Sequence, residues 1–239
     1  MKKTITIPED LYDVTVDQYQ RVQAIPEGDE LRQVVKTISI MCHVTTEEVM
    51  GMEKKDIEHI GGVLGGIIDK YDDAYPVERI IELDTRYGFH PNLSRITLAE
   101  FADIETLCKD SFDKNLPQVM GILYRPVVEQ HGEFYRIEEY DGEDRSEYFR
   151  GMKMAHALGA AAFFFAYRAR VSRRFGQLFQ GGEGSKLSEK YGWFATFVHL
   201  AGEDITKLPA VERTHLETAL AWLSYEQDRA LLEKQKMNL

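Results

Sequence analysis

The sequence predicts a mainly α-helical fold with a small β component (α+β), and three observations support this prediction. Apolar residues recur at helical spacing over most of the chain, as in the segment 29–41. Thr15, Thr45 and Thr97 are each followed three residues later by Glu or Gln, a pattern that caps helix N-termini. Strand-like segments are short, and we expect strands or hairpins only near residues 4–7, 79–90 and 133–140.

The same patterns place the helices in order along the chain. We expect helices near residues 15–26, 29–41, 45–52, 56–68, 97–107, 116–124, 145–178, 187–201 and 210–236. The segment 145–178 contains three consecutive aromatic residues, Phe163, Phe164 and Phe165, which together cover most of a helix circumference. Such a helix should be buried nearly all round.

The length of 239 residues fits one large domain or two small ones. Residues 180–185 include three glycines, and this flexible composition marks a candidate linker. We therefore expect a mixed helical domain with small β elements at 1–180. A C-terminal helical segment at 181–239 could pack on the same core.

Composition and charge exclude several classes of protein. The net charge is −11, which disfavours a general nucleic-acid binder because the phosphate backbone attracts positive surface. The two cysteines, Cys42 and Cys108, are far apart and form no disulfide framework, as expected in a reducing cytoplasm. The most apolar stretch, 154–167, is too short to span a bilayer, so we expect no membrane partner.

Motifs for catalysis or metal binding are not found. The seven histidines form neither HxxxH nor HExxH, and the chain contains no GxSxG motif. The glycine-rich segment 61–66 lacks the GK[ST] ending of a phosphate loop, and its spacing favours close helix packing. The sequence thus predicts no catalytic residue, cofactor, metal site or small-molecule substrate.

One pattern of charge, in contrast, marks a candidate interaction surface. Residues 149–182 contain no acidic residue but six basic ones, which are Arg150, Lys153, Arg168, Arg170, Arg173 and Arg174. The last three share a helical face. They either complement the helix dipole on a solvated surface or form a docking surface for an acidic partner or a neighbouring copy.

A series of short motifs resembles a family of tailed-bacteriophage proteins described as tail assembly chaperone-like or as tail and baseplate-hub assembly proteins. In chain order the motifs are TITIP at 4–8, VTVDQYQ at 14–20, ISI at 38–40, TEEV at 46–49, ITLAEFADIE at 96–105, LYRP at 123–126, YDG at 140–142, LGA at 158–160, FFF at 163–165, GW at 192–193, LAGEDITK at 200–207 and AWLSYE at 221–226. These are packing and turn motifs, and their order carries the resemblance.

The resemblance implies a non-enzymatic protein that acts through protein–protein contacts during tail assembly. Its partners would be other phage tail or connector proteins and copies of itself, in the host cytoplasm or in the virion tail. The candidate partner-binding residues are Arg168, Arg170, Arg173, Arg174, Tyr124, Arg125 and Trp193. Two alternatives stay open: a small soluble enzyme whose active site follows no motif, and a nucleic-acid accessory protein that uses the arginines of 168–174.

Overall fold

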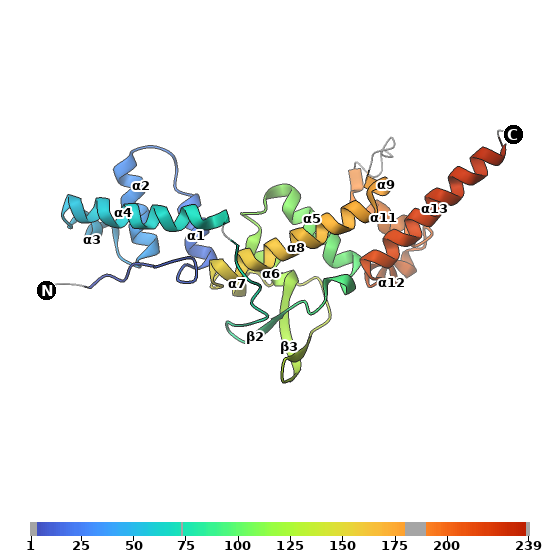
Figure 1. Cartoon of the computed structure of the whole chain (residues 1–239), viewed down its shortest axis with the longest axis horizontal. Helices are drawn as coiled ribbons and strands as arrows, with labels where there is room; N and C mark the ends of the chain where they lie inside the picture. The colour runs from blue at the N-terminus through green and yellow to red at the C-terminus, as the bar shows by residue number, and fades with distance from the viewer. Residues whose placement is uncertain (1–3, 73, 180–189, 238–239) are drawn as a thin grey trace. The chain divides into compact units, whose positions relative to one another are not determined.

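The computed structural model describes residues 4–72, 74–179 and 190–237 (Figure 1). It confirms the predicted fold class, since helices dominate and a single small antiparallel sheet accompanies them in the described residues. Contacts divide the chain into two compact units. Unit 1 comprises residues 1–89, 111–139 and 143–163, and unit 2 comprises 90–110, 140–142 and 164–239.

Unit 1 begins with a group of helices, two of which start at the predicted caps Thr15 and Thr45. The helices are α1 (Val16–Gln23), α2 (Glu30–Met41), α3 (Thr46–Met50) and α4 (Lys54–Ile68), followed by the 3₁₀ helix η1 (Asp69–Asp72). Capping boxes form at Thr15 and Thr45, where each hydroxyl accepts a hydrogen bond from the backbone N–H three residues on. Helix α2 packs on α1, α3 and α4 and buries Ile38 fully.

The predicted role of the glycines at 61–66 holds for one position. A Cβ atom on Gly61 would lie 2.8 Å from Val34 of α2, so a larger residue would push these two helices apart. At Gly62, Gly65 and Gly66 a Cβ would meet nothing within 4 Å. Close packing therefore explains Gly61 alone.

The sheet of unit 1 has the strand order β1-β2-β3-β4, with every neighbouring pair antiparallel. The strands are β1 (Ile80–Glu82), β2 (Arg86–Phe89), β3 (Tyr124–His131) and β4 (Phe134–Ile137). Helix α6 (Leu116–Leu123) leads directly into β3. The pairs Gly88↔Arg125 and Gln130↔Tyr135 set the register.

The predicted strands near 79–90 and 133–140 are confirmed, but two other expectations for the sheet are wrong. Residues 4–7 form no strand, because alternation alone does not supply a pairing partner. Strand β3 was missed because Pro126 lies in it, and proline is rare in central strands. Proline lacks an N–H, but the Pro126 carbonyl still accepts a hydrogen bond from the Glu138 N–H at 3.0 Å.

The single helix expected at 145–178 is also wrong. The structure has α7 (Ser146–Phe149), α8 (Met154–Arg174) and α9 (Gly176–Phe179). Tertiary pairing interrupts the helix: the Val16 N–H donates to the Met152 carbonyl at 2.9 Å, and the Met154 N–H donates to the Val14 carbonyl at 2.8 Å. These bonds pair Lys153 with Thr15 in an isolated antiparallel bridge, and residues 150–152 form a turn between α7 and α8.

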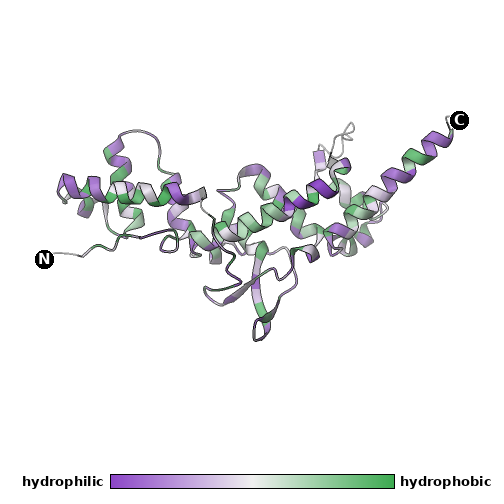
Figure 2. Cartoon of the chain, in the orientation of Figure 1, coloured by the Kyte–Doolittle hydropathy of each residue, from purple (hydrophilic) through white to green (hydrophobic). Residues whose placement is uncertain are grey.

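Small residues bury the first half of α8 in unit 1. Ala155, Ala157 and Ala160 are fully buried, and a Cβ on Gly159 would overlap the carbonyl oxygen of Pro76. Figure 2 shows the hydrophobic character of α8 giving way to hydrophilic residues toward its C-terminus. The helix is not buried all round, because Phe163 is 52% exposed whereas Phe164 is only 1% exposed.

Unit 2 combines most of α5, the second half of α8 and α9 with further helices, of which α13 is the longest. Its elements are η2 (Leu93–Arg95), α5 (Leu98–Ser111, of which Ser111 belongs to unit 1), α11 (Trp193–Leu200), η3 (Ile205–Lys207), α12 (Leu208–Glu212) and α13 (Leu216–Met237). The helix expected at 210–236 starts later because the Leu98 N–H donates to Thr214 and the Leu216 N–H to Ile96. The predicted linker and domain boundary at 180–185 lie outside the described residues.

The contrast within the aromatic run yields a stability prediction. Phe164→Ala should lower the free energy of unfolding by about 3–5 kcal/mol, because it opens a cavity in a packed core. Phe163→Ala, one residue away, should cost about 1–2 kcal/mol, since half of that side chain already faces water. Urea denaturation measures both; equal losses would contradict the burial described here.

The glycines of α8 and α4 provide a second prediction. Gly159→Ala should destabilise the protein by several kcal/mol or prevent folding, because the Pro76 oxygen is backbone and cannot move aside freely. Gly65→Ala should stabilise it by about 0.5–1 kcal/mol, since alanine is the better helix former and the added methyl meets nothing. Thermal denaturation compares the two variants, and a neutral Gly159→Ala would contradict the close approach.

Candidate protein-interaction surfaces

The arginines singled out by the sequence lie on the second half of α8, in unit 2. Arg168 forms a two-pronged ion pair with Glu105 of α5, in which its Nη2 donates to Oε2 at 2.9 Å. This hydrogen bond to Glu105 is the main reason that the pKa of Arg168 is raised. Arg174 pairs with Glu217 of α13. Distant acidic residues of the same unit therefore neutralise two of the four arginines.

Arg170 and Arg173 are exposed on the same part of α8. The guanidinium of Arg170 lies over the ring of Tyr167, 5.1 Å from its centroid. Burial raises the pKa of Tyr167 to about 12, so its ring stays neutral at ordinary pH. These two arginines are the part of the predicted basic face that is open to a partner.

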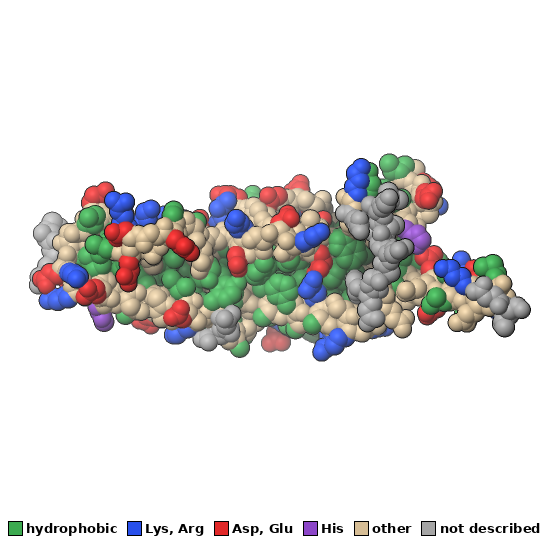
Figure 3. Space-filling model, turned by 90° about the horizontal axis from the view of Figure 1, so that it is seen from above, with side chains coloured by type: hydrophobic (Ala, Val, Ile, Leu, Met, Phe, Trp, Pro, Cys, Tyr) green, Lys and Arg blue, Asp and Glu red, His purple; other side chains and the backbone are tan. Residues whose placement is uncertain are grey.

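Acidic and basic side chains are interspersed over the face drawn in Figure 3. Basic and acidic side chains also form surface ion pairs at α4, where Lys54 lies beside Glu58, and at β2, where Arg86 lies beside Glu82. Such pairs contribute about 0–1 kcal/mol each and leave no strong field of one sign. Charge alone therefore does not mark a docking surface on this face.

Two predicted partner-binding residues are buried inside unit 1. Tyr124 is fully buried between the rings of Phe89 and Phe149, and its hydroxyl donates to the Glu78 carbonyl at 2.6 Å. Burial strongly raises the pKa of this hydroxyl. Arg125 is only 4% exposed. The LYRP motif thus supports the fold, and we do not assign these two side chains to a partner-binding surface.

Trp193 begins α11 in unit 2 and is half-buried. Its ring meets Phe101 of α5 edge-on, with the ring centroids 5.7 Å apart. The next residue, Phe194, is half exposed. No described residue of α11 is fully buried, although most of its side chains are apolar. This helix has more apolar surface than its described neighbours cover.

The largest exposed apolar side chains were missed by the sequence analysis. In unit 1, Phe134 is 84% exposed near the turn between β3 and β4. In unit 2, the residues Trp222, Tyr225, Leu231 and Leu232 of α13 are each more than half exposed. Hydropathy colouring shows hydrophobic turns between hydrophilic ones along α13 (Figure 2). The available signal was the spacing of Trp222, Tyr225 and Leu232 on one helical face.

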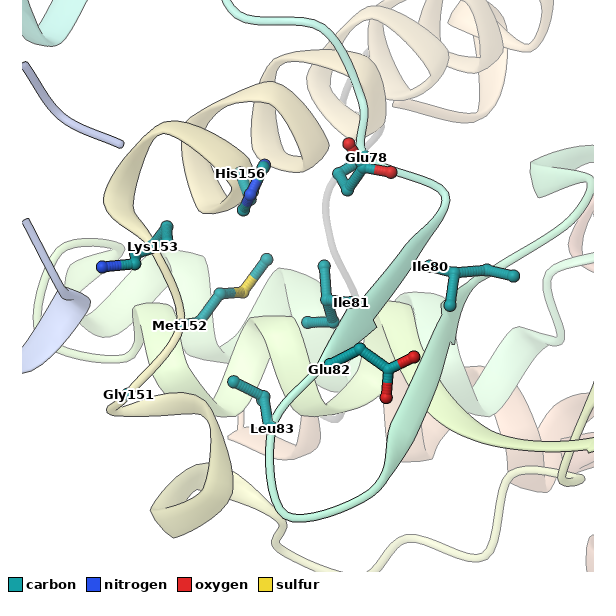
Figure 4. Close-up of a pocket in the computed structure, with 9 residues that line it drawn as sticks. All are labelled: Glu78, Ile80, Ile81, Glu82, Leu83, Gly151, Met152, Lys153 and His156. Atoms are coloured by element: carbon teal, nitrogen blue, oxygen red, sulfur yellow. The ribbon is translucent and has the colours of Figure 1, made fainter. Parts of the chain in front are cut away.

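A small cavity in unit 1 has a volume of about 250 Å³. It lies between the segment 78–83 and the start of α8, with Glu78, Lys153 and His156 on its walls (Figure 4). Burial lowers the pKa of His156, whose ring also meets Tyr12 edge-on. Ligand pockets usually measure about 300–1,000 Å³, so this cavity falls below their range.

Neither a metal-binding group nor a membrane-spanning helix is found where the structure describes the chain. Among residues 4–72, 74–179 and 190–237, no cluster of His, Cys, Asp and Glu is arranged to hold a metal ion. Over the same residues, no helix combines the length and the hydropathy needed to cross a bilayer.

Comparisons with known proteins give no match. No family model, no curated protein and no solved structure matches this chain.

The ion pair on α8 leads to a third prediction. Arg168→Glu should lower the free energy of unfolding by about 1 kcal/mol, because it removes the pair and sets two carboxylates together. The double variant Arg168→Glu, Glu105→Arg should recover most of this loss. Arg173→Glu is the matched control and should change stability by less than about 0.5 kcal/mol. Urea denaturation measures the free energy of unfolding of each variant. A double variant no more stable than the single one would contradict the pairing of Arg168 with Glu105.

Proposed function

We propose that this chain is a non-enzymatic tail-morphogenesis protein of a tailed bacteriophage and that it acts by binding other proteins. The observation that carries the protein-binding part is the set of large apolar side chains left exposed in both units, above all on α11 and α13. Exposed apolar surface of this kind is typical of sites that a partner covers.

The phage assignment is supported by the order of the motifs from residue 4 to residue 226. Several of these motifs have packing roles: Thr15 and Gln18 form a capping box, Tyr124 is a core residue, and Gly159 allows the close approach of α8. A shared set of packing motifs would preserve one fold across related assembly proteins. The proposed partners are tail or connector proteins of the same phage.

The nucleic-acid alternative is less well supported. Of the four arginines on α8, Arg168 and Arg174 are engaged by Glu105 and Glu217. That leaves Arg170 and Arg173 on a chain of net charge −11. A phosphate backbone requires several free positive charges along one surface, and two are few for such a site.

Deletion of the gene from the phage that carries it tests the proposal. We expect lysates that contain filled heads without complete tails by electron microscopy, and plaque formation restored by a plasmid copy. Mass spectrometry of purified wild-type particles then separates the two roles, because a tail or connector subunit is present in them and an assembly chaperone is not. Normal, infectious tailed particles from the deletion strain would contradict the proposal.

A further inference from the structure

Strand β1 is an edge of the sheet, and among the described strands it has a neighbour on one side only. In an antiparallel pair, residues whose N–H and C=O groups point to the partner strand alternate with residues whose groups point away. The Leu83 N–H donates to the Thr85 carbonyl at 2.9 Å, so Ile81 and Leu83 direct their backbone groups to β2. The backbone groups of Ile80 and Glu82 therefore point to the free edge.

The small cavity of unit 1 lies along this free edge (Figure 4). Its lining includes Ile80 and Glu82, whose side chains are on one face of the strand, and Ile81 and Leu83, whose side chains are on the other. A cavity over one face of the sheet would be lined by only one of these pairs. The opposite wall is formed by residues of the segment 151–156. The edge therefore borders a space that a further strand can enter.

A free edge beside a cavity is suited to binding an extended peptide, which adds to the sheet as a further strand. Main-chain hydrogen bonds hold such a strand, and a pocket beside the edge selects its alternate side chains. The volume of about 250 Å³ is small for a ligand but can take apolar side chains. The expected occupant is an extended segment with an apolar residue at every second position.

The chain itself contains such a segment near its N-terminus. Residues Thr4, Ile5, Thr6 and Ile7 alternate polar and apolar, and Thr and Ile both favour strands. Within the described chain these four residues pair with no strand and make no backbone hydrogen bond, and both isoleucines are only half-buried. Figure 1 shows this part of unit 1 running away from the sheet of its own chain. The sheet edge that it can fill is therefore that of a second copy.

An antiparallel register fits the segment to the edge. With Ile5 opposite Ile81 of the second copy, the outward backbone groups of β1 bond to those of Thr4 and Thr6. Ile5 then lies on the buried side of β1 and fills the cavity. Pro8 has no N–H to donate and ends the pairing. The segment thus supplies both the hydrogen bonds and the apolar side chain that the edge can accept.

The charges agree with the antiparallel direction. Lys2 and Lys3 precede the segment, so antiparallel pairing brings them to the end of β1 that carries Glu82 and Asp84. Parallel pairing in the same alignment would place Lys3 opposite Arg79, and like charges directly opposite each other are destabilising. Glu82 already has an ion-pair partner on β2, but both side chains are exposed and such a pair contributes little.

We propose that residues 2–7 of one copy add as a strand to the free edge of β1 in a second copy. The site is an interaction surface for a second copy of this chain. Because the contact joins two different surfaces, the copies associate head to tail. The proposal concerns the purified protein and does not depend on the proposed phage function.

Complementation between two variants tests this proposal by analytical ultracentrifugation. One variant lacks residues 2–7. The other, Ile80→Pro, keeps the segment but loses the outward N–H of the edge, a position at which an edge strand tolerates proline. The wild type should form species larger than a monomer as its concentration rises, and each variant alone should stay monomeric. An equimolar mixture of the two variants should form a 1:1 dimer, because one supplies the segment and the other the edge.

Three results would overturn the proposal: a wild type that stays monomeric, a variant lacking residues 2–7 that still associates, or a mixture of folded variants that stays monomeric. Circular dichroism checks that each variant keeps the wild-type fold.

Alternation along the segment provides a second test that leaves β1 unchanged. Ile5→Lys should weaken self-association at least about ten-fold, because it places a charge in the cavity beside Ile81. Thr4→Lys is the matched control, since its side chain lies on the other side of the strand beside Glu82. It should keep the affinity within about two-fold of the wild type or tighten it. Equal weakening by both variants, or no weakening by Ile5→Lys, would contradict the added strand.

Discussion

The burial of the first half of α8 is the constraint on which the rest of unit 1 depends. At its N-terminus the N–H groups of Met154 and Ala155 donate to the carbonyls of Val14 and Leu11. Its small side chains let the backbone at Pro76 come into contact. The same pairing interrupts the helix before Met154 and positions Phe149 against Tyr124. The sheet is thereby attached to the helices through a shared aromatic core.

The C-terminal helices differ from unit 1, because several of their large apolar side chains remain exposed to water. Phe164 and Tyr167 of α8 are buried, and ion pairs from Arg168 and Arg174 connect this helix to α5 and α13. Beyond these contacts, α11 keeps Phe194 exposed, and α13 carries Trp222, Tyr225 and Leu232 in water. Exposed apolar surface of this kind agrees with the proposed role in binding another protein.

Much of the fold could be predicted from local signals. The capping boxes at Thr15 and Thr45 and the helix periodicity of 29–41 depend on neighbouring residues, and the structure confirms them. The break at 150–153 and strand β3 both depend on pairing with segments that are distant in the sequence. Local patterns, such as the one around Pro126, do not show this pairing. The candidate site was predicted less well for the same reason. Tyr124 and Arg125 are buried by residues far away in sequence, and the acidic partners of Arg168 and Arg174 lie on other helices.

The second half of α13 is exposed along its whole length, which leaves it open for another protein to cover. Amide hydrogen exchange of the purified protein measures this directly. Amides of residues 227–237 should exchange rapidly in a sample shown to be monomeric, while those of the first half of α8 stay protected. Protection of residues 227–237 in such a sample would show that they pack within the chain itself and would contradict this openness.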